Sequence, residues 1–381
     1  MPNRVLFVDD DPKILAAFRR QLRKTVDMET VPSGAEGLDA IRHRGPFSVV
    51  VTDYCMPEMN GIEFLKRVQE IAPESVRMLL TGSADLNAAI EAVNQGNIFR
   101  FLTKPCSTEA LTEALLTGMK KYRRSRKERK FNQRTRRSLA QAMDIQQCLM
   151  PSASPCVDGL DISGRSIYCE QTGGDYYDYF EKKTADTHRV GIVVGDVSDH
   201  GLPSALLMTT ARAFFRESAS RDTSVASVVG SVNRHLTHDV QATGRFMTLF
   251  YAEIEPLARR IRWVRAGHDP GMLYDPRAGR FEELAGQGGL PLGVFEEAVY
   301  EEYQRGLAPG HVIAIGTDGI WEARNSQGLM FGKPALQQII REHAERTCAE
   351  IVREVLDALK KFLLPLELQD DATLVVVKVE R

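Results

Sequence analysis

Five polar residues in the first 110 positions each follow a short apolar run: Asp9, Asp10, Asp53, Thr81 and Lys104. If those runs are parallel strands, their carboxyl ends meet at one edge of a sheet, where such folds bind ligands. Three carboxylates in one crevice repel each other unless a divalent cation lies among them, and oxygen ligands suit Mg²⁺. A central aspartate can then attack a phosphoryl group, while the hydroxyl and the lysine neutralise the transferred charge. Each aspartate alone would be explained as a turn or capping residue, but their joint placement predicts a phosphoryl-transfer site.

A second acidic set lies in the C-terminal part of the chain, beside glycines and apolar runs. Its four motifs occupy residues 173–178, 195–198, 316–319 and 370–373. Glycines allow close backbone approach, and oxygen-only ligands suit Mg²⁺ or Mn²⁺ better than zinc. Two such ions about 3.5–4 Å apart activate one water for in-line attack on phosphorus. Spacing alone also fits four unrelated turn aspartates, although no cysteine or serine nucleophile motif competes nearby.

The first 120 residues alternate between short apolar runs and stretches with helical periodicity. The apolar runs lie at 5–8, 28–31, 49–51, 78–80 and 99–102. Apolar residues recur at helical spacing in 14–22 and 35–41. Continuous apolar strands are typical of a parallel sheet that is covered on both faces. Residues 1–120 are therefore predicted to form a doubly wound, five-stranded α/β domain.

A long helical segment is predicted to follow. No proline interrupts residues 107–150, Gly118 is the only glycine there, and Pro151 ends the segment. We expect one long helix, or two in series, with residues 121–150 as the linker between two domains. Its middle, 120–137, is strongly basic with Glu128 as the only acid. A solvated helix face explains this charge, with phosphate or nucleic-acid contact as the alternative.

Residues 151–381 have a different sequence pattern, in which strand-like runs are separated by turns that contain glycine and aspartate. Strand-like runs lie at 190–194, 248–254, 261–264, 312–315 and 373–379. Helical stretches lie near 205–215, 225–237, 334–343 and 349–362. This mixture predicts a single layered α+β domain of about 230 residues.

The composition limits the classes of partner and compartment. The 381 residues are 43% hydrophobic and 26% charged, with a formal net charge of −2, which gives no global attraction to nucleic acid or an anionic membrane. No apolar segment is long enough to cross a bilayer, and the start of the chain lacks the features of a signal peptide. The six cysteines are scattered without metal-binding spacing. We therefore expect a cytoplasmic protein with no membrane and no nucleic-acid partner.

The first acidic site resembles the response-regulator receiver family, which has a flavodoxin-like fold, over about 120 residues. The motifs that carry the resemblance are FVDDDP at 7–12, VTDYCMP at 51–57 with Asn60-Gly61, LTG at 80–82 and LTKP at 102–105. The resemblance implies that Asp53 is the phosphoacceptor. It also implies that Mg²⁺ is held by Asp9, Asp10, Asp53 and the carbonyl of Cys55. Thr81, Lys104 and Phe101 would be the residues that respond to phosphorylation of Asp53. Phe101 occupies the family's aromatic switch position, but it lacks the hydroxyl group of the tyrosine found there in the family. A sensor histidine kinase is the implied partner.

The second site resembles the PPM-type metal-dependent protein phosphatases, in the SpoIIE/RsbU branch, over roughly residues 140–381. The motifs are IQQCLMP at 145–151, the four aspartate motifs, AGHDP at 266–270 and PLG at 291–293. The resemblance implies a β-sandwich flanked by helices that binds two Mn²⁺ or Mg²⁺ ions. The segment at 168–172 departs from the family pattern, which bears on substrate contacts there.

The same resemblance assigns the metal ligands. Asp175, Asp196 and the Val197 carbonyl would hold one ion, while Asp196, Asp318 and Asp370 would hold the other. These four aspartates are the implied catalytic residues. Asp371 is the alternative to Asp370 at the last position. We expect Asp178 and His268 to have structural roles instead.

The implied substrate is phosphoserine or phosphothreonine on a STAS-type anti-sigma-factor antagonist, with phosphorylation of Asp53 controlling the phosphatase. A pseudophosphatase that only binds its partner is the main alternative, although a degenerate site usually lacks one of the aspartates. A GGDEF-type cyclase is disfavoured because Tyr176-Tyr177 follow Gly173-Gly174-Asp175 and the later aspartates would be unexplained. A DNA-binding regulator is disfavoured because no region has the size of a helix-turn-helix domain.

An apolar stripe along the linker predicts self-association. Its members are Leu115, Met119, Tyr122, Leu139 and Met143. The stripe is too sparse to bury itself in a monomer, so pairing with a second chain would shelter it once salt screens the basic middle. We therefore expect a homodimer through the linker helix, with a packing that changes on phosphorylation.

Overall fold

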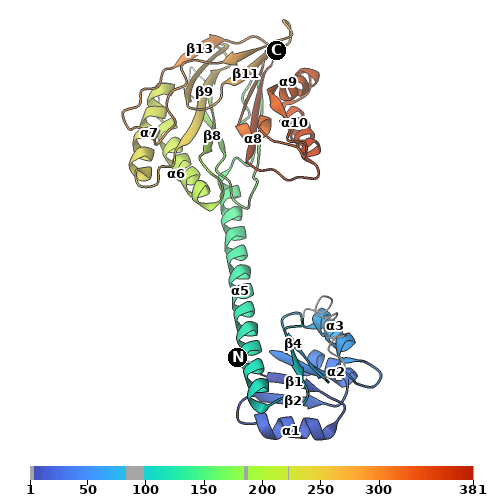
Figure 1. The fold of residues 1–381 in the computed structure, drawn as a ribbon. Coiled ribbons are helices and arrows are strands. Elements are labelled where there is room, and N and C mark those ends of the chain that lie inside the picture. The colour runs from blue at the N-terminus through green and yellow to red at the C-terminus, as the bar shows by residue number, and fades with distance from the viewer. Residues whose placement is uncertain (1–3, 83–97, 184–187, 222, 381) are drawn as a thin grey trace. The chain divides into compact units, whose positions relative to one another are not determined.

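The computed structural model describes residues 4–82, 98–183, 188–221 and 223–380. These residues form two compact units, 1–136 and 137–381. One continuous helix, α5 (Thr108–Leu149), contributes to both units, so the linker is a single helix and not two in series (Figure 1). Each unit is described by itself below.

The first unit contains a five-stranded parallel sheet. Its strands are β1 (Arg4–Val8), β2 (Asp27–Val31), β3 (Val49–Asp53), β4 (Val76–Thr81) and β5 (Arg100–Thr103). Their order is β2-β1-β3-β4-β5, and all pairs are parallel. The apolar runs of the central strands are buried, as expected for a sheet covered on both faces. The predicted doubly wound architecture is confirmed.

Three described helices of this unit begin where the sequence supplies a capping side chain. They are α1 (Pro12–Leu22), α2 (Gly34–Arg44) and α3 (Gly61–Ile71). Asp11, Ser33 and Asn60 each accept a backbone N–H from the first turn of the helix that follows. The cap at Asn60 fixes the start of α3 directly after the β3 loop, beside the carboxyl end of the strand that carries Asp53. Residues 83–97, between β4 and β5, lie outside the described residues.

The first part of α5 belongs to the core of this unit. Leu115, Met119 and Tyr122 are buried there against the sheet and α1. The expectation that these three residues need a second chain for shelter is therefore wrong, because their own sheet covers them. The apolar side chains of α5 that stay open to solvent include Phe131, 68% exposed, and Ile145, 65% exposed.

The second unit contains two five-stranded antiparallel sheets. The first has the order β13-β10-β9-β8-β7. Its strands are β7 (Tyr176–Lys183), β8 (His188–Val197), β9 (Met247–Glu255), β10 (Arg260–Ala266) and β13 (Tyr303–Gly306). Strand β8 pairs with both β7 and β9, so it lies inside the sheet. Asp196 lies near its carboxyl end.

The second sheet has the order β12-β11-β14-β15-β6. Its strands are β6 (Leu160–Ile167), β11 (Gly271–Asp275), β12 (Arg280–Leu284), β14 (Val312–Gly316) and β15 (Ala372–Val379). Side chains from both sheets form one core, which includes Val194, Phe250, Ile313 and Val375. The two sheets therefore pack face to face as a β-sandwich.

Helices cover the outer faces of the sandwich (Figure 1). Helices α6 (Leu202–Ala219) and α7 (Val225–Val240) pack on the first sheet. Helices α8 (Asp318–Trp321), α9 (Gly332–Glu342) and α10 (Cys348–Leu363) pack on the second. The predicted layered α+β domain is confirmed, as a helix-flanked sandwich. Within the described part of the chain, no helix combines the length and apolarity needed to cross a membrane.

Candidate functional site

The carboxyl edge of the parallel sheet gathers the first acidic set. Ligand oxygens of Asp9, Asp10 and Asp53 all lie within 4.8 Å of one another. Lys104 Nζ lies 2.8 Å from Asp9 Oδ2 and 2.7 Å from Asp53 Oδ1. Lys104 pairs with two of the three carboxylates, Asp9 and Asp53, so among the described residues the cluster carries more negative than positive charge, which suits a divalent cation.

Asp53 is held in a crowded, largely buried place. Burial raises the pKa of its carboxyl group, and the hydrogen bond and charge of Lys104 act against that rise. Gly61 follows the β3 loop, and a Cβ atom there would lie 2.1 Å from the backbone oxygen of Asp53. Residue 61 of the Asn60-Gly61 motif must therefore be glycine, because a larger residue would collide with the backbone of Asp53.

The other predicted residues of this site occupy neighbouring strand ends. Thr81 is buried and pairs with Thr103, and the Lys104 N–H donates to the Thr81 carbonyl at 2.8 Å. Phe101 is partly buried against the core on the α2–α3 face of the sheet. Cys55 lies exposed in the loop after Asp53. Thr81, Lys104 and Cys55 thus lie at the same edge as the aspartates, whereas Phe101 lies within β5, beside Leu79 of β4.

The second acidic set is organised around Asp175, at the start of β7. The Asp175 side chain is buried, and its Oδ2 accepts a hydrogen bond from Thr317 Oγ1 at 2.8 Å. Its other oxygen, Oδ1, is buried with no hydrogen-bond partner. A buried carboxylate oxygen without a partner is costly unless a cation binds it. Burial and the charges of Asp196 and Asp371 raise the pKa of Asp175 well above its usual value.

Asp196 and Asp318 face the same cleft. Burial, then the charges of Asp318, Asp370 and Asp371, raise the pKa of Asp196 to about 8. Burial and the charge of Asp370 also raise the pKa of Asp318. Asp196 and Asp318 line a cavity of about 100 Å³ together with Thr248, Gly267, His268, Asp269 and Glu322. Mutual repulsion among uncompensated carboxylates indicates a site for cations.

The spacing of this set differs from that of the first. Among the residues that the structure describes, only Asp9, Asp10 and Asp53 bring three acidic ligand atoms within 4.8 Å of one another. The four aspartates of the second unit are therefore spread more widely.

The adjacent aspartates 370 and 371 have different surroundings. Asp371 is buried, and its two oxygens accept the backbone N–H groups of Cys169 at 2.8 Å and Gly174 at 2.7 Å. Asp370 is exposed, and its Oδ1 accepts the N–H of Asp371 at 2.8 Å. Asp371 thus ties three loops together, whereas Asp370 keeps an oxygen for a ligand. This geometry supports Asp370 as the metal ligand.

Glycines bring backbone against backbone around the cleft. A Cβ at Gly174 would lie 3.0 Å from the Val197 carbonyl oxygen, which places this predicted ligand beside the Asp175 segment. A Cβ at Gly319 would lie 2.0 Å from the Asp371 carbonyl oxygen. The start of α8, and with it Asp318, can approach Asp371 only because residue 319 is glycine.

Asp178 and His268 have structural environments. Asp178 accepts two hydrogen bonds from Arg216, both at 2.8 Å, and one from Tyr176 Oη at 2.9 Å, so it joins β7 to α6. His268 Nε2 lies 3.0 Å from the Gly316 carbonyl oxygen, and its Nδ1 lies 2.9 Å from Thr248 Oγ1. Both ring nitrogens are therefore occupied. Burial lowers the pKa of His268 to about 4.

Sequence reasoning missed two polar residues that support the cleft, Thr317 and Gln146. Thr317 directly precedes Asp318 in the motif at 316–319, and this position could have indicated that its hydroxyl supports the acidic site. Gln146 is one of two neighbouring glutamines on α5, and only the structure distinguishes the buried one. Asp371 was named only as an alternative ligand, and its backbone contacts were not anticipated.

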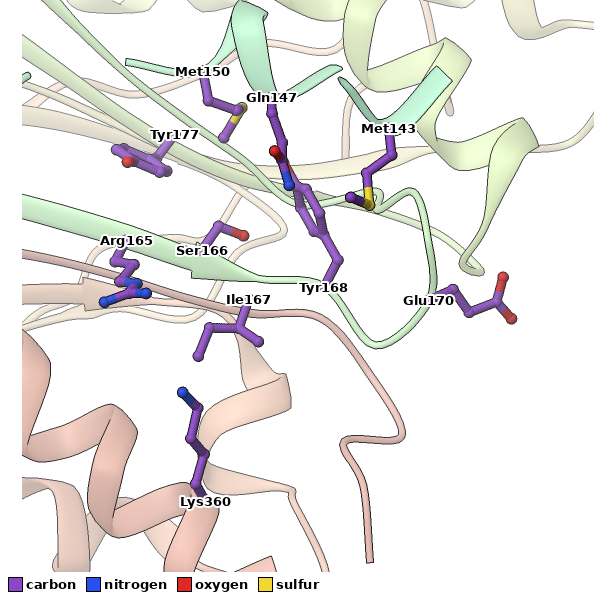
Figure 2. A pocket seen from close by; sticks show the side chains of 10 residues that line it. All are labelled: Met143, Gln147, Met150, Arg165, Ser166, Ile167, Tyr168, Glu170, Tyr177 and Lys360. Atoms are coloured by element: carbon purple, nitrogen blue, oxygen red, sulfur yellow. The ribbon is translucent and has the colours of Figure 1, made fainter. Parts of the chain in front are cut away.

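A larger cavity, about 390 Å³, lies beside the end of α5. Figure 2 shows Met143 and Gln147 of that helix, and Met150 just beyond its end, lining the cavity opposite Arg165 and Ile167 of β6. Tyr168 lines the same cavity. It contains none of the predicted metal ligands and lies on the side of the second unit where α5 meets β6.

The arrangement of the second site fits the predicted divalent ions. The donor set consists of carboxylate and carbonyl oxygens, which suit Mg²⁺ or Mn²⁺. The unpartnered Oδ1 of Asp175 and the raised pKa values of the neighbouring acids are observations of this structure that favour cation binding. Such a site can support hydrolysis of a phosphate ester.

Comparison with known proteins gives two matches to family models. Residues 5–116 match the response regulator receiver domain. Residues 186–380, about half of the chain, match stage II sporulation protein E. The two matches fall on the two compact units.

Individual relatives agree with these matches. The chain is 29% identical over 272 residues to the phosphoserine phosphatase RsbU of Bacillus subtilis, covering 71% of this chain and 79% of RsbU. It is 26% identical to the phosphoserine phosphatase RsbP of the same organism, covering 66% of this chain and 60% of RsbP. Among solved structures, the SiaA PP2C domain of Pseudomonas aeruginosa covers 65% of this chain and is itself covered to 98%, with a TM-score of 0.56 and 22% identity. That structural likeness shows the PP2C fold.

Proposed function

Since this chain belongs to the SpoIIE family of PPM-type phosphatases and carries a response regulator receiver domain, we propose that it is a phosphoprotein phosphatase controlled by phosphorylation of Asp53. The observation that carries the proposal is the cleft of the second unit. There a buried carboxylate oxygen of Asp175 has no partner, and burial, together with repulsion from neighbouring acids, raises the pKa of Asp196 to about 8.

The metal ligands of the phosphatase are part of the proposal. Asp175, Asp196 and the Val197 carbonyl hold one divalent ion, and Asp196, Asp318 and Asp370 hold the second. When bound, Mn²⁺ or Mg²⁺ ions supply Lewis-acid activation of water and of the phosphoryl group. The chain itself orients the ligands: Thr317 fixes one oxygen of Asp175, and the fit of Gly319 against Asp371 sets the position of Asp318.

The proposed substrate is phosphoserine or phosphothreonine on a partner protein, specifically a STAS-type anti-sigma-factor antagonist. Two relatives over most of the second unit, RsbU and RsbP, are phosphoserine phosphatases. The described cavity beside Asp196 and Asp318 is only about 100 Å³ and has a polar, acidic lining, which is small for a pocket that encloses a small-molecule substrate. A phosphorylated loop on a protein surface suits such a cleft better.

The receiver is the proposed input. A sensor histidine kinase supplies the phosphoryl group, Asp53 accepts it, and Asp9, Asp10, Asp53 and the carbonyl of Cys55 hold Mg²⁺. Lys104, which already contacts Asp53 Oδ1 at 2.7 Å, would then face the phosphoryl oxygens. Thr81 and Phe101 are the proposed switch residues.

Self-association through α5 completes the proposal. Phe131 and Ile145 are largely exposed and lie two heptads apart on the helix. That spacing puts them on one seam if the helix pairs with a second copy. The buried residues Leu115, Met119 and Tyr122 have no part in this seam.

The experiment that tests the function is phosphate release from a serine-phosphorylated STAS-domain protein by the full chain. We expect release with Mn²⁺ and none after chelation with EDTA. Binding of the phosphoprotein without release in Mn²⁺ would instead identify a pseudophosphatase that sequesters its partner.

A further inference from the structure

A buried glutamine lies at the end of α5, where the helix enters the second unit. Gln146 is 4% exposed, whereas its neighbours Ile145 and Gln147 are exposed. A buried side-chain amide is unfavourable unless its donors and acceptor are satisfied. The contacts of Gln146 therefore need an explanation in terms of what they hold.

Gln146 bonds both polar groups of a single residue, Gly173. Its Nε2 donates to the Gly173 carbonyl at 2.6 Å, and its Oε1 accepts the Gly173 N–H at 3.1 Å. The backbone N–H can only donate, so it fixes the orientation of the amide. A residue opposite Gly173 in an antiparallel sheet would make the same pair of bonds, to the N–H and the C=O of one residue.

Gly173 is packed closely against its neighbours, with no room for a side chain. A Cβ on it would lie 2.1 Å from Tyr168 Cδ1 and 2.4 Å from Asp371 Oδ2. The next residue, Gly174, donates its N–H to Asp371 Oδ2 at 2.7 Å. The segment that leads into Asp175 is thus held by Gln146 on one side and by Asp371 on the other.

We propose that Gln146 is a positioning residue of the phosphatase site, which orients the metal ligand Asp175 through the backbone of Gly173. The inference rests on the proposed function for the role of Asp175. Only Gly174 separates the clamped residue from a carboxylate whose Oδ1 is buried without a partner. Loss of the clamp frees that segment to turn, so Asp175 no longer presents Oδ1 toward the ion. The last turns of α5 are in this way part of the active site.

The test compares Gln146→Ala with Gln147→Ala in the full chain. The two glutamines are neighbours on one helix, but Gln147 is exposed and lines the 390 Å³ cavity (Figure 2). We expect Gln146→Ala to weaken Mn²⁺ binding, measured by calorimetry, by at least about tenfold, because two hydrogen bonds to the ligand segment are lost. Gln147→Ala should leave Mn²⁺ binding unchanged. Gln146→Glu, which keeps an acceptor for the Gly173 N–H and loses the donor, should lie between them.

Turnover and hydrogen exchange separate positioning from a general loss of structure. In Gln146→Ala, saturating Mn²⁺ should restore phosphate release to within a few fold of wild type, and exchange should rise in the peptide that holds Gly173. Unchanged Mn²⁺ affinity would overturn the proposal, as would a loss of turnover that Mn²⁺ does not rescue. Mn²⁺ affinity is measured without substrate, so these outcomes can be told apart from failure of the phosphatase proposal itself. That proposal fails if the wild-type chain releases no phosphate.

Discussion

Thr317 Oγ1 donates to Asp175 Oδ2 at 2.8 Å and joins residues 142 positions apart in sequence. The same hydroxyl accepts the N–H of Thr373 at 3.0 Å, so β15 shares the contact. One hydroxyl therefore connects β7, β14 and β15 at the point where the acidic cleft begins. It also leaves Asp175 Oδ1 as the oxygen available for a cation.

This relationship predicts the effect of Thr317→Val, which keeps the shape and removes the hydroxyl. Two buried groups, Asp175 Oδ2 and the Thr373 N–H, lose a partner, so the free energy of unfolding should fall by about 1–3 kcal/mol. Urea unfolding measures this change. Thr210→Val is the matched control, since that hydroxyl bonds only the backbone of its own helix, at 3.1 Å. Equal stability of the two variants would show that the contact contributes nothing.

The buried His268 predicts a pH effect on stability. Burial lowers its pKa to about 4, whereas an unfolded histidine titrates near 6.5. Between these values only the unfolded chain takes up the proton, so this histidine's contribution to stability is lost as pH falls from about 6.5 toward 4. By pH 5 the loss amounts to about 2 kcal/mol.

The check on His268 is a comparison with His268→Gln in metal-free buffer. Asp196, whose pKa is raised to about 8, contributes in the opposite direction, because the folded chain then binds the proton more tightly as pH falls. The difference between wild type and variant isolates the histidine. That difference should shrink from pH 7 to pH 5, and a constant difference would contradict a lowered pKa.

Two variants of the receiver test whether Asp53 is the phosphoacceptor. Asp53→Asn should abolish labelling by acetyl phosphate while the fold is kept, because the change is nearly isosteric. Gly61→Ala places a Cβ 2.1 Å from the Asp53 carbonyl oxygen, so it should destabilise the receiver and reduce labelling. Gly306→Ala, with nothing within 4 Å of the added Cβ, is the control for a glycine substitution. Labelling that persists in Asp53→Asn at another residue would exclude Asp53 as the acceptor.

Much of the fold could be predicted because the apolar runs are continuous. Strands β1, β3 and β4 of the parallel sheet and the central strands of the sandwich are buried runs of this kind. Strands β11, β12 and β13 were missed, and so were β6 and β7. Strand β6 mixes Asp161, Ser163 and Gly164 with apolar residues, and β7 ends in charged residues. Their pairing with β15 and β8, not their own composition, determines that they are strands.

The candidate site was predictable in residue type and less so in arrangement. Aspartates beside glycines at strand ends can be recognised in the sequence. The choice between Asp370 and Asp371, however, depends on which carboxylate accepts hydrogen bonds from backbone N–H groups. The burial of Leu115, Met119 and Tyr122 was also misjudged. Helical periodicity shows that a stripe will be covered and does not show whether its own domain or a second chain covers it.

The continuous helix α5 predicts a phase dependence of regulation. Inserting two residues near Arg134 rotates the following helix by about 200°, whereas inserting seven nearly restores its face. The first insertion should uncouple phosphatase activity from Asp53 phosphorylation, and the second should largely preserve the coupling. Phosphate release with and without acetyl phosphate measures both. If regulation survives both insertions, the helix is a passive tether.

The most direct test of the central claim is phosphate release from a serine-phosphorylated STAS-domain protein by wild type and by Asp318→Ala, in Mn²⁺. The account predicts metal-dependent release by the wild type and a loss of at least about 10³-fold in the variant, because a ligand of the catalytic metals is gone. Thermal unfolding should change little, and Asp357→Ala, on the exposed face of α10, should retain full activity. Near wild-type release by Asp318→Ala with Mn²⁺ supplied would contradict the account.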